Sequence, residues 1–117
     1  MTFYDVPIKV NSDPSLNATD LLLERVALAP GHVLFSRENP DKSWRNVSSD
    51  EFLEEVKSLA KGLINAGIKP GDAIAIMSRT RYEWTMIDFA IWFAGAISVP
   101  IYESSAPSQM EWILSDS

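Results

Sequence analysis

The tripeptide Ser78-Arg79-Thr80 is the part of this sequence best suited to binding an anion. It lies between an expected strand and an expected helix, where two hydroxyls and a guanidinium can surround a phosphate at a helix N-terminus. The same residue types also cap helices without binding a ligand. Gly62 and Gly67 have the spacing of a G-x-x-x-x-G-K-[ST] phosphate loop, but isoleucine follows the second glycine where that loop needs lysine. We therefore predict either an anion site or a plain helix cap at the tripeptide, and no phosphate loop.

Among the charged side chains, Asp88 stands out because it lies inside a strongly apolar helix. A buried carboxylate needs a partner, and Arg81 lies seven residues earlier, two helical turns away. This spacing predicts a structural ion pair rather than a catalytic acid. The single histidine, His32, opens a peripheral strand and cannot complete a Ser–His–Asp triad. Since the chain also has no cysteine, we predict no catalytic, cofactor-binding or metal-binding residue in it.

The composition is that of a globular chain and argues against several classes of function. Apolar residues make up 46% of the 117 residues, enough for one core. The net charge of −6 disfavours a nucleic-acid partner, because phosphate backbones attract basic surfaces. The most apolar stretch, residues 86–101, is interrupted by Asp88, Gly95 and Pro100, so we expect no transmembrane segment. The N-terminus has no signal-peptide pattern, and we predict a cytoplasmic protein.

The chain reads as an extended arm followed by alternating helices and strands. The arm, rich in Pro, Asn, Ser and Asp, covers residues 1–18, and residues 19–117 form the expected domain. Asn17 or Thr19 provides the first helix cap. Apolar periodicity and turn residues set the other bounds. The expected elements are helix 19–28, a hairpin of strands 32–36 and 43–47, helix 48–67, strand 73–78, helix 80–94, strand 97–102 and a last helix from about residue 107.

Two of these helices begin with the pattern of a capping box, in which a hydroxyl and a carboxylate three residues apart bind each other's backbone amides. The pairs are Ser48 with Glu51 and Thr80 with Glu83. Strand 73–78 alternates small and large apolar residues, so we predict that both of its faces are buried, as in a parallel sheet. The order of elements predicts an α/β fold, with a short hairpin before helix–strand–helix–strand–helix.

Helix 80–94 is apolar on nearly all sides and needs cover on more than one face. So much apolar surface exceeds what the other expected elements can cover, and exposed patches of this kind mark interfaces. We therefore expect the chain to self-associate or to bind a partner surface. We assign the four tryptophans to the core or to an interface: Trp44, Trp84, Trp92 and Trp112.

A series of short motifs runs in register from about residue 20 to residue 117. The motifs are Trp44–Phe52, Leu59–Leu63, Gly67–Asp72, Ile74–Ser78, Arg81–Trp84 and Ala94–Tyr102. This series resembles the adenylate-forming, AMP-binding enzymes. Within that superfamily, Glu83-Trp84 and the segment 99–102 are similar to the long-chain fatty acyl-CoA synthetases, whereas Glu103 departs from the small or Thr-rich turn of that branch.

The resemblance implies that the chain is the scaffold at the start of the large N-terminal domain of a much longer enzyme. The whole enzyme would use ATP, Mg²⁺ and coenzyme A to convert a fatty acid into acyl-CoA through an acyl-adenylate, in the cytoplasm or at a membrane surface. The family's catalytic residues have no matching positions in this chain. We therefore expect an inactive N-terminal fragment whose partner is the remainder of the synthetase.

Two other hypotheses remain open from the sequence. One is a stand-alone, non-catalytic binding or interaction module built on the same scaffold. The other is a nucleotide-binding regulator that uses the turn at residues 78–80.

Overall fold

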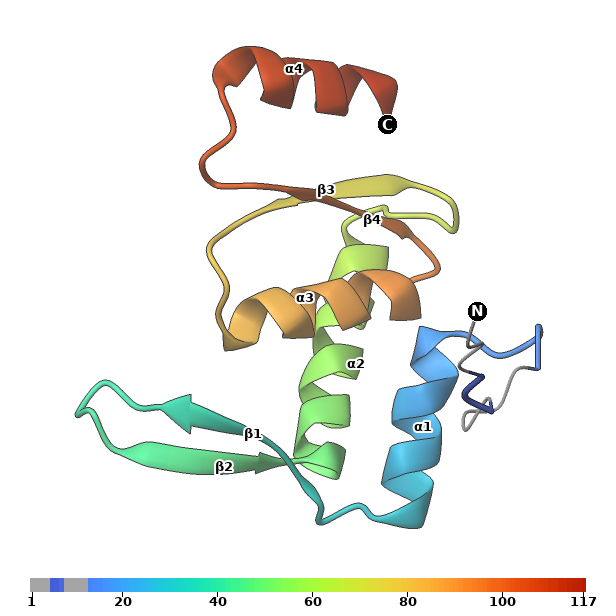
Figure 1. The fold of residues 1–117 in the computed structure, drawn as a ribbon, viewed down its shortest axis with the longest axis vertical. Helices are drawn as coiled ribbons and strands as arrows, with labels where there is room; N and C mark the ends of the chain where they lie inside the picture. The colour runs from blue at the N-terminus through green and yellow to red at the C-terminus, as the bar shows by residue number, and fades with distance from the viewer. Residues whose placement is uncertain (1–4, 8–12) are drawn as a thin grey trace.

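A computed structural model describes residues 5–7 and 13–117. Residues 1–4 and 8–12 of the predicted arm lie outside the described residues. Figure 1 shows two small sheets at opposite ends of a group of three helices, with a fourth helix beyond the second sheet. The elements of the described part are α1 (Ala18–Leu28), β1 (Val33–Glu38), β2 (Trp44–Ser48), α2 (Ser49–Asn65), β3 (Ala73–Met77), α3 (Tyr82–Phe93), β4 (Ile97–Ile101) and α4 (Pro107–Asp116).

Helix α1 begins at a complete capping box, in which Asn17 is the cap residue. Its side-chain oxygen accepts from the amides of Thr19 at 2.9 Å and Asp20 at 3.2 Å. The Asp20 carboxylate in turn accepts from the amide of Asn17 at 3.0 Å. Of the two caps considered from the sequence, asparagine is therefore the right one, and the reciprocal bond satisfies a further amide at the helix start.

The hairpin of β1 and β2 is antiparallel, as predicted, and extends two residues beyond the expected end of the first strand. His32 precedes β1 rather than opening it, and its carbonyl accepts from the amide of Ser49 at 2.8 Å. The Ser49 side chain is fully buried and its hydroxyl contacts the carbonyl oxygens of Ala29 at 2.7 Å and Pro30 at 2.8 Å. These bonds tie the end of α1 to the start of α2.

Helix α2 has the single buried stripe that its periodicity predicts. Phe52, Val56 and Ala60 are buried along it. Gly67 follows the helix with a φ of +102°, and the amide of Ile68 folds back onto the carbonyl of Leu63 at 3.1 Å. This left-handed glycine end is the predicted one.

The two predicted capping boxes at Ser48 and Thr80 are wrong. The Ser48 hydroxyl donates to Asp50 at 2.5 Å instead of capping the helix. Glu51 binds Arg45, and Glu83 binds two arginines. Arginines compete with the helix-end amides for these two carboxylates, and in this structure the carboxylates form ion pairs instead of the predicted capping boxes.

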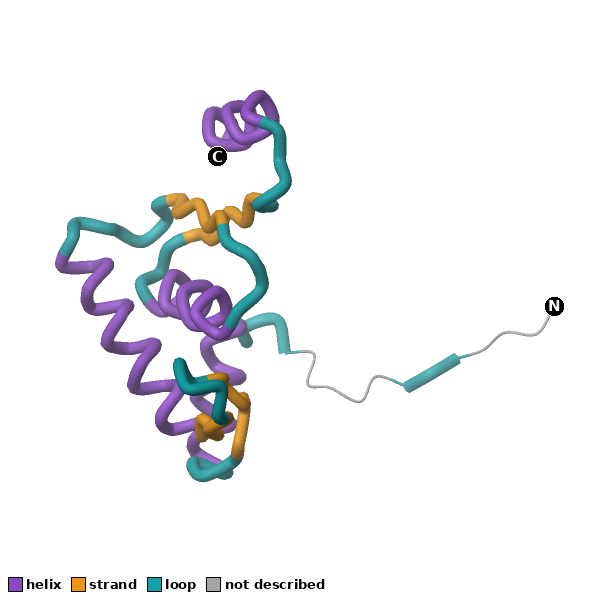
Figure 2. The backbone as a smooth tube through the Cα atoms, turned by 90° about the vertical axis from the view of Figure 1, so that its left-hand side faces the viewer, coloured by secondary structure: helices purple, strands orange, loops and turns teal. Residues whose placement is uncertain are grey.

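Strands β3 and β4 pair in parallel, as expected, with Ala73 opposite Ile97 and Met77 opposite Ile101. Both views place this sheet between α3 and α4 (Figures 1 and 2). Its inner face, which includes Ile74 and Ile76, packs against α2 and α3. The prediction that both faces are buried is wrong, because Ala73, Ala75 and Met77, which share the face of β3 opposite to Ile74 and Ile76, are exposed.

Helix α3 is the most covered element, since every residue from Tyr82 to Phe93 is buried or half-buried. One core cluster joins Ala90 to the buried stripe of α2. A second joins Ile91 to Ile76 of the inner sheet face. The expectation that this apolar helix needs cover on several faces is confirmed. None of the helices in the described ranges is both long and apolar enough to cross a bilayer.

Candidate functional site

The predicted anion candidate, Ser78-Arg79-Thr80, lies at the carboxyl end of β3. It lines a cavity of about 480 Å³ together with residues 100–104, which end and follow β4. Ligands of α/β proteins commonly bind at this edge of a sheet. The Ser78 hydroxyl, however, donates to the carbonyl of Arg79 at 3.1 Å, and Glu103 lines the same cavity. Since the lining contains a carboxylate as well as the Arg79 guanidinium, the turn does not form a cradle of donors for a phosphate.

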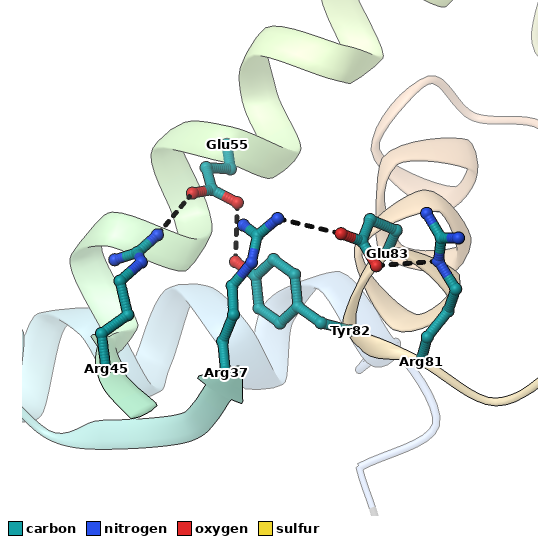
Figure 3. Close-up of polar contacts among 6 residues, drawn as sticks. All are labelled: Arg37, Arg45, Glu55, Arg81, Tyr82 and Glu83. Atoms are coloured by element: carbon teal, nitrogen blue, oxygen red, sulfur yellow. Dashed lines mark hydrogen bonds and ion pairs between the residues drawn. The ribbon is translucent and has the colours of Figure 1, made fainter. Parts of the chain in front are cut away.

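A cluster of charged side chains forms a second candidate site between the hairpin and the helices. It lies beside a cleft of about 720 Å³ at the start of α3. The hairpin register places two arginines directly opposite each other, from β1 and β2. Like charges in this position repel, so carboxylates from the helices must neutralise them. Figure 3 shows the cluster, whose labelled members are Arg37, Arg45, Glu55, Arg81, Tyr82 and Glu83.

Glu83 bridges two of the arginines. One of its carboxylate oxygens lies 2.9 Å from Nη2 of Arg37, and the other lies 2.8 Å from Nε of Arg81. The Arg37 guanidinium also lies over the Tyr82 ring, 4.7 Å from its centroid. Strand β1 and the start of α3 are thus joined by an ion pair and a cation–π contact, both made by Arg37.

Helix α2 completes the cluster with two carboxylates one turn apart. Glu51 accepts from Nη1 of Arg45 at 2.5 Å, and Glu55 lies 3.7 Å from its Nη2. The Tyr82 hydroxyl donates to the other oxygen of Glu55 at 2.7 Å. Tyr82 therefore contacts the hairpin through its ring and α2 through its hydroxyl.

Three members of the cluster have a shifted pKa. Burial, followed by the hydrogen bond to Glu55, raises the pKa of Tyr82 well above its ordinary value, so the phenol stays protonated and remains a donor. The backbone amide of Glu83, helped by Arg81 and Arg37 and opposed by burial, lowers the pKa of the Glu83 carboxyl. The hydrogen bond to Glu51 raises the pKa of Arg45.

This arrangement suits a structural role more than a catalytic one. A phenol with a raised pKa that donates to a carboxylate is a poor nucleophile and a poor general acid. Each arginine of the cluster already has a carboxylate partner. The side chains are partly exposed, so each ion pair contributes at most about 1 kcal/mol to stability. Together they fix the position of the hairpin relative to α2 and α3.

Sequence reasoning did not find this cluster. The available signals were two arginines at facing positions of a hairpin and the acidic residues one turn apart on the next helix. Each was assigned separately, to a strand or to a helix start, because the sequence does not show which helix the hairpin packs against.

The predicted ion pair between Asp88 and Arg81 is wrong. Asp88 is buried, but it accepts a hydrogen bond from the hydroxyl of Ser98 on β4. Arg81 is the extended residue before α3, with φ −158° and ψ 169°, so helical spacing does not bring it onto the face of Asp88. A serine hydroxyl from the neighbouring strand has replaced the cation as the partner of this carboxylate.

The other residues singled out from the sequence have structural positions. Gly62 lies inside α2 and Gly67 behind its end, so they form no phosphate loop. Of the tryptophans, Trp84 and Trp92 are half-buried on α3, whereas Trp44 and Trp112 are exposed at 68% and 67%.

The described residues do not fit a divalent cation. Magnesium binds clustered oxygen ligands. In residues 5–7 and 13–117, the structure brings together no group of three acidic or histidine side chains that could hold a metal ion. The acidic residues of the charged cluster are instead taken by arginines.

Comparisons with known proteins agree with the fold. The chain is 40% identical over 101 residues to the long-chain-fatty-acid–CoA ligase FadD15 of Mycobacterium bovis. Its structure superposes with a TM-score of 0.75 and 25% identity on a protein of Rhodopseudomonas palustris described as a long-chain-fatty-acid CoA ligase, over 86% of this chain and 24% of that one. It also matches Klebsiella oxytoca NpsA in complex with 3-hydroxyanthranilyl-AMSN, at a TM-score of 0.73 and 25% identity, over 83% of this chain and 19% of that one.

The match to FadD15 covers 86% of this chain and only 17% of that ligase. The chain therefore spans about one sixth of the length of its curated relative. The family of AMP-binding enzymes matches residues 22–117, which include all of β1 through α4 and most of α1. The α/β fold, the motif order and this match lead to one conclusion: the chain belongs to the AMP-binding enzyme family.

Proposed function

We propose that this chain is the N-terminal scaffold segment of a long-chain fatty acid–CoA ligase and that it performs neither chemical step by itself. The observation that carries the proposal is the 40% identity to FadD15 across 86% of the chain. The coverage of 17% of that ligase supports the view that the chemistry belongs to other parts of the enzyme.

The whole enzyme would make acyl-CoA in two steps. A carboxylate oxygen of the fatty acid attacks the α-phosphorus of ATP, which forms the acyl-adenylate and releases pyrophosphate. The sulfur of coenzyme A then attacks the acyl carbonyl carbon, its proton is lost, and AMP leaves. The resemblance also implies Mg²⁺, but the described residues offer it no ligand set, so we assign it no step here.

The proposed contribution of this chain is to position other parts of the enzyme. The charged cluster holds the hairpin, and the apolar core of α2 and α3 supports the β3–β4 sheet. The carboxyl ends of these strands point to the edge at which α/β enzymes bind ligands. In this account the sheet is a support for a site whose reacting groups come from elsewhere in the ligase.

Reading the gene beyond the codon for Ser117 tests the proposal against the alternative, a stand-alone interaction module. We expect an open frame that continues into a Ser/Thr/Gly-rich phosphate loop. A native stop codon directly after Ser117 would favour the module and reject the ligase segment.

We also propose two kinds of partner. One is the remainder of the ligase, and the other, for the isolated chain, is a second copy of itself. Exposed apolar side chains support this proposal, among them Met77 at 50%, Ile97 at 56% and Trp112 at 67%. Apolar surface of this extent favours association when its own partner is not present.

A further inference from the structure

Two opposite charges follow the paired ends of β3 and β4. The register of this parallel pair sets Met77 opposite Ile101. Arg79 and Glu103 each lie two residues beyond these positions, so the two strands bring a guanidinium and a carboxylate to the same edge of the sheet. Both residues line the cavity of about 480 Å³ at the end of β3. The lining of this cavity therefore contains one cationic and one anionic group.

Neither charge is neutralised within the described part of the chain. The ion pairs found there join other side chains, so Arg79 and Glu103 do not pair with each other either. Both residues are exposed. The arginines of the charged cluster, in contrast, each have a carboxylate partner. The Arg79 guanidinium is thus available to a ligand carboxylate, and the Glu103 carboxylate is available to a ligand ammonium group.

Much of the remaining lining is apolar. Trp84 is half-buried and Ile101 buried, while Pro100 and Tyr102 are exposed. A turn, in which the amide of Ser105 donates to the carbonyl of Tyr102 at 3.0 Å, holds the segment that carries the carboxylate. Small-molecule sites are typically cavities of this size, mostly apolar, with a few polar groups that fix the orientation of the ligand. A ligand with an apolar side chain gains affinity here because it buries this surface.

We propose that this cavity binds a zwitterion, namely an α-amino acid with a large apolar side chain. The ligand carboxylate accepts from the Arg79 guanidinium, which can hold it through two parallel hydrogen bonds. The ligand ammonium group donates to Glu103, and the ligand side chain lies against Trp84 and Pro100. Glu103 repels a phosphate and Arg79 repels a simple amine, so the two charges together select a ligand that carries both. This binding site goes beyond the proposed function and does not depend on it.

The four tryptophans allow this cavity to be observed separately from the others. Trp84 lines it, Trp44 lines the cleft beside the charged cluster, and Trp92 and Trp112 line two further cavities. The isotope-labelled chain is titrated with L-phenylalanine near neutral pH, and the indole N–H signals are followed by NMR. Trp84→Phe assigns the signal of the cavity. We expect a saturable shift of the Trp84 signal and no shift of the other three.

Three related compounds test which groups of the ligand are recognised. Phenylpropionate lacks the ammonium group, phenethylamine lacks the carboxylate, and glycine lacks the apolar side chain. We expect each of the first two to bind about tenfold more weakly than L-phenylalanine, which corresponds to the loss of one hydrogen bond between charged groups. Glycine should give no saturable shift. Binding of phenethylamine or phenylpropionate as tight as that of L-phenylalanine would overturn the zwitterion site, because the cavity would then recognise only an aromatic ring.

Two variants remove the charges of the cavity one at a time. Arg79→Gln and Glu103→Gln should each weaken L-phenylalanine binding about tenfold. Lys61→Gln, which removes an exposed cation of α2 outside this cavity, is the matched control and should leave binding unchanged. The signals of the other three tryptophans in the absence of ligand show whether each variant is folded. An equal loss in the control, or no saturable Trp84 shift up to the solubility limit of L-phenylalanine, would overturn the proposal.

Discussion

Tyr82 joins three elements at the scale of single residues. Its ring lies 5.5 Å from that of Phe35 on β1 and 6.0 Å from that of Phe52 on α2, while its hydroxyl donates to Glu55. The ring contacts bury apolar surface, and the hydroxyl satisfies a partly buried carboxylate. Removing the hydroxyl alone therefore tests the polar part of the contact without changing the packing.

We predict that Tyr82→Phe lowers the free energy of unfolding by about 1.5 kcal/mol, the low end of the range for a hydrogen bond to a charged group, because this bond is only partly buried. Urea unfolding of the variant and the parent chain measures it. Tyr102→Phe is the matched control, because Tyr102 is 84% exposed and its change should stay within about 0.5 kcal/mol. Equal effects of the two substitutions would show that the bond to Glu55 does not stabilise the fold.

Glu83 makes stability depend on pH. Its backbone amide and the two arginines hold its pKa below the ordinary value of 4.5 in the folded chain. A lowered folded-state pKa contributes stability above the unfolded-state value, and this contribution is lost as the pH falls through the folded-state pKa. Thermal unfolding of Glu83→Gln should therefore differ most from the parent near pH 7. The two melting temperatures should converge below pH 4.5, and a difference that does not change with pH contradicts this account.

At the scale of elements, Gly95 controls the turn from α3 into β4. It has a φ of +77°, and its carbonyl accepts from the amide of Gly71 at 2.9 Å. A Cβ built here lies 3.2 Å from Cβ of Pro70. The turn thus requires glycine for its backbone conformation and for the close approach of the loop before β3.

We predict that Gly95→Ala destabilises the chain by about 1–2 kcal/mol, the cost of a left-handed non-glycine residue, with a further cost from the contact with Pro70. Gly62→Ala, inside α2, meets no atom within 4 Å and should stabilise the chain by about 0.5–1 kcal/mol. Denaturant unfolding of both variants measures the contrast. Opposite signs are expected, and a stabilising Gly95→Ala would contradict the geometry of this turn.

Most elements could be predicted from sequence because their signals are local. The buried stripe of α2 and the glycine after it follow from spacing within one helix. The local sequence could not show that the capping boxes at Ser48 and Thr80 would fail, because Glu51 and Glu83 form ion pairs with arginines of the hairpin. A competing partner from another element decided the outcome, and no local pattern contains that information.

At the scale of the whole molecule, the described residues form a covered interior with open sides. Helix α3 is enclosed, yet Trp44, Trp112 and the outer face of β3 are exposed. The sequence predicted more apolar surface than the other elements could cover, from the number of apolar residues alone. It could not place that surface, because the position depends on the packing of all the elements: helix α3, the expected location, is covered, and the β3–β4 sheet is open instead.

We predict that the isolated chain self-associates as its concentration rises. Static light scattering should give a mean mass above 13.1 kDa at high concentration. Replacing Met77 and Ile97 by lysine should reduce this association, since both are exposed apolar side chains of the β3–β4 sheet, at 50% and 56%, whereas Leu28→Lys on α1, where the leucine is 75% exposed, serves as a control away from the sheet. A mass of one chain at every concentration would contradict the prediction.

We propose that this member of the AMP-binding enzyme family provides a scaffold and not the chemistry. The most direct test incubates the purified 117-residue chain with ATP, Mg²⁺, a long-chain fatty acid and coenzyme A, beside intact FadD15 as the positive control. We expect no acyl-CoA and no pyrophosphate above the protein-free blank. Acyl-CoA formation by the chain alone, in proportion to its concentration, would contradict it.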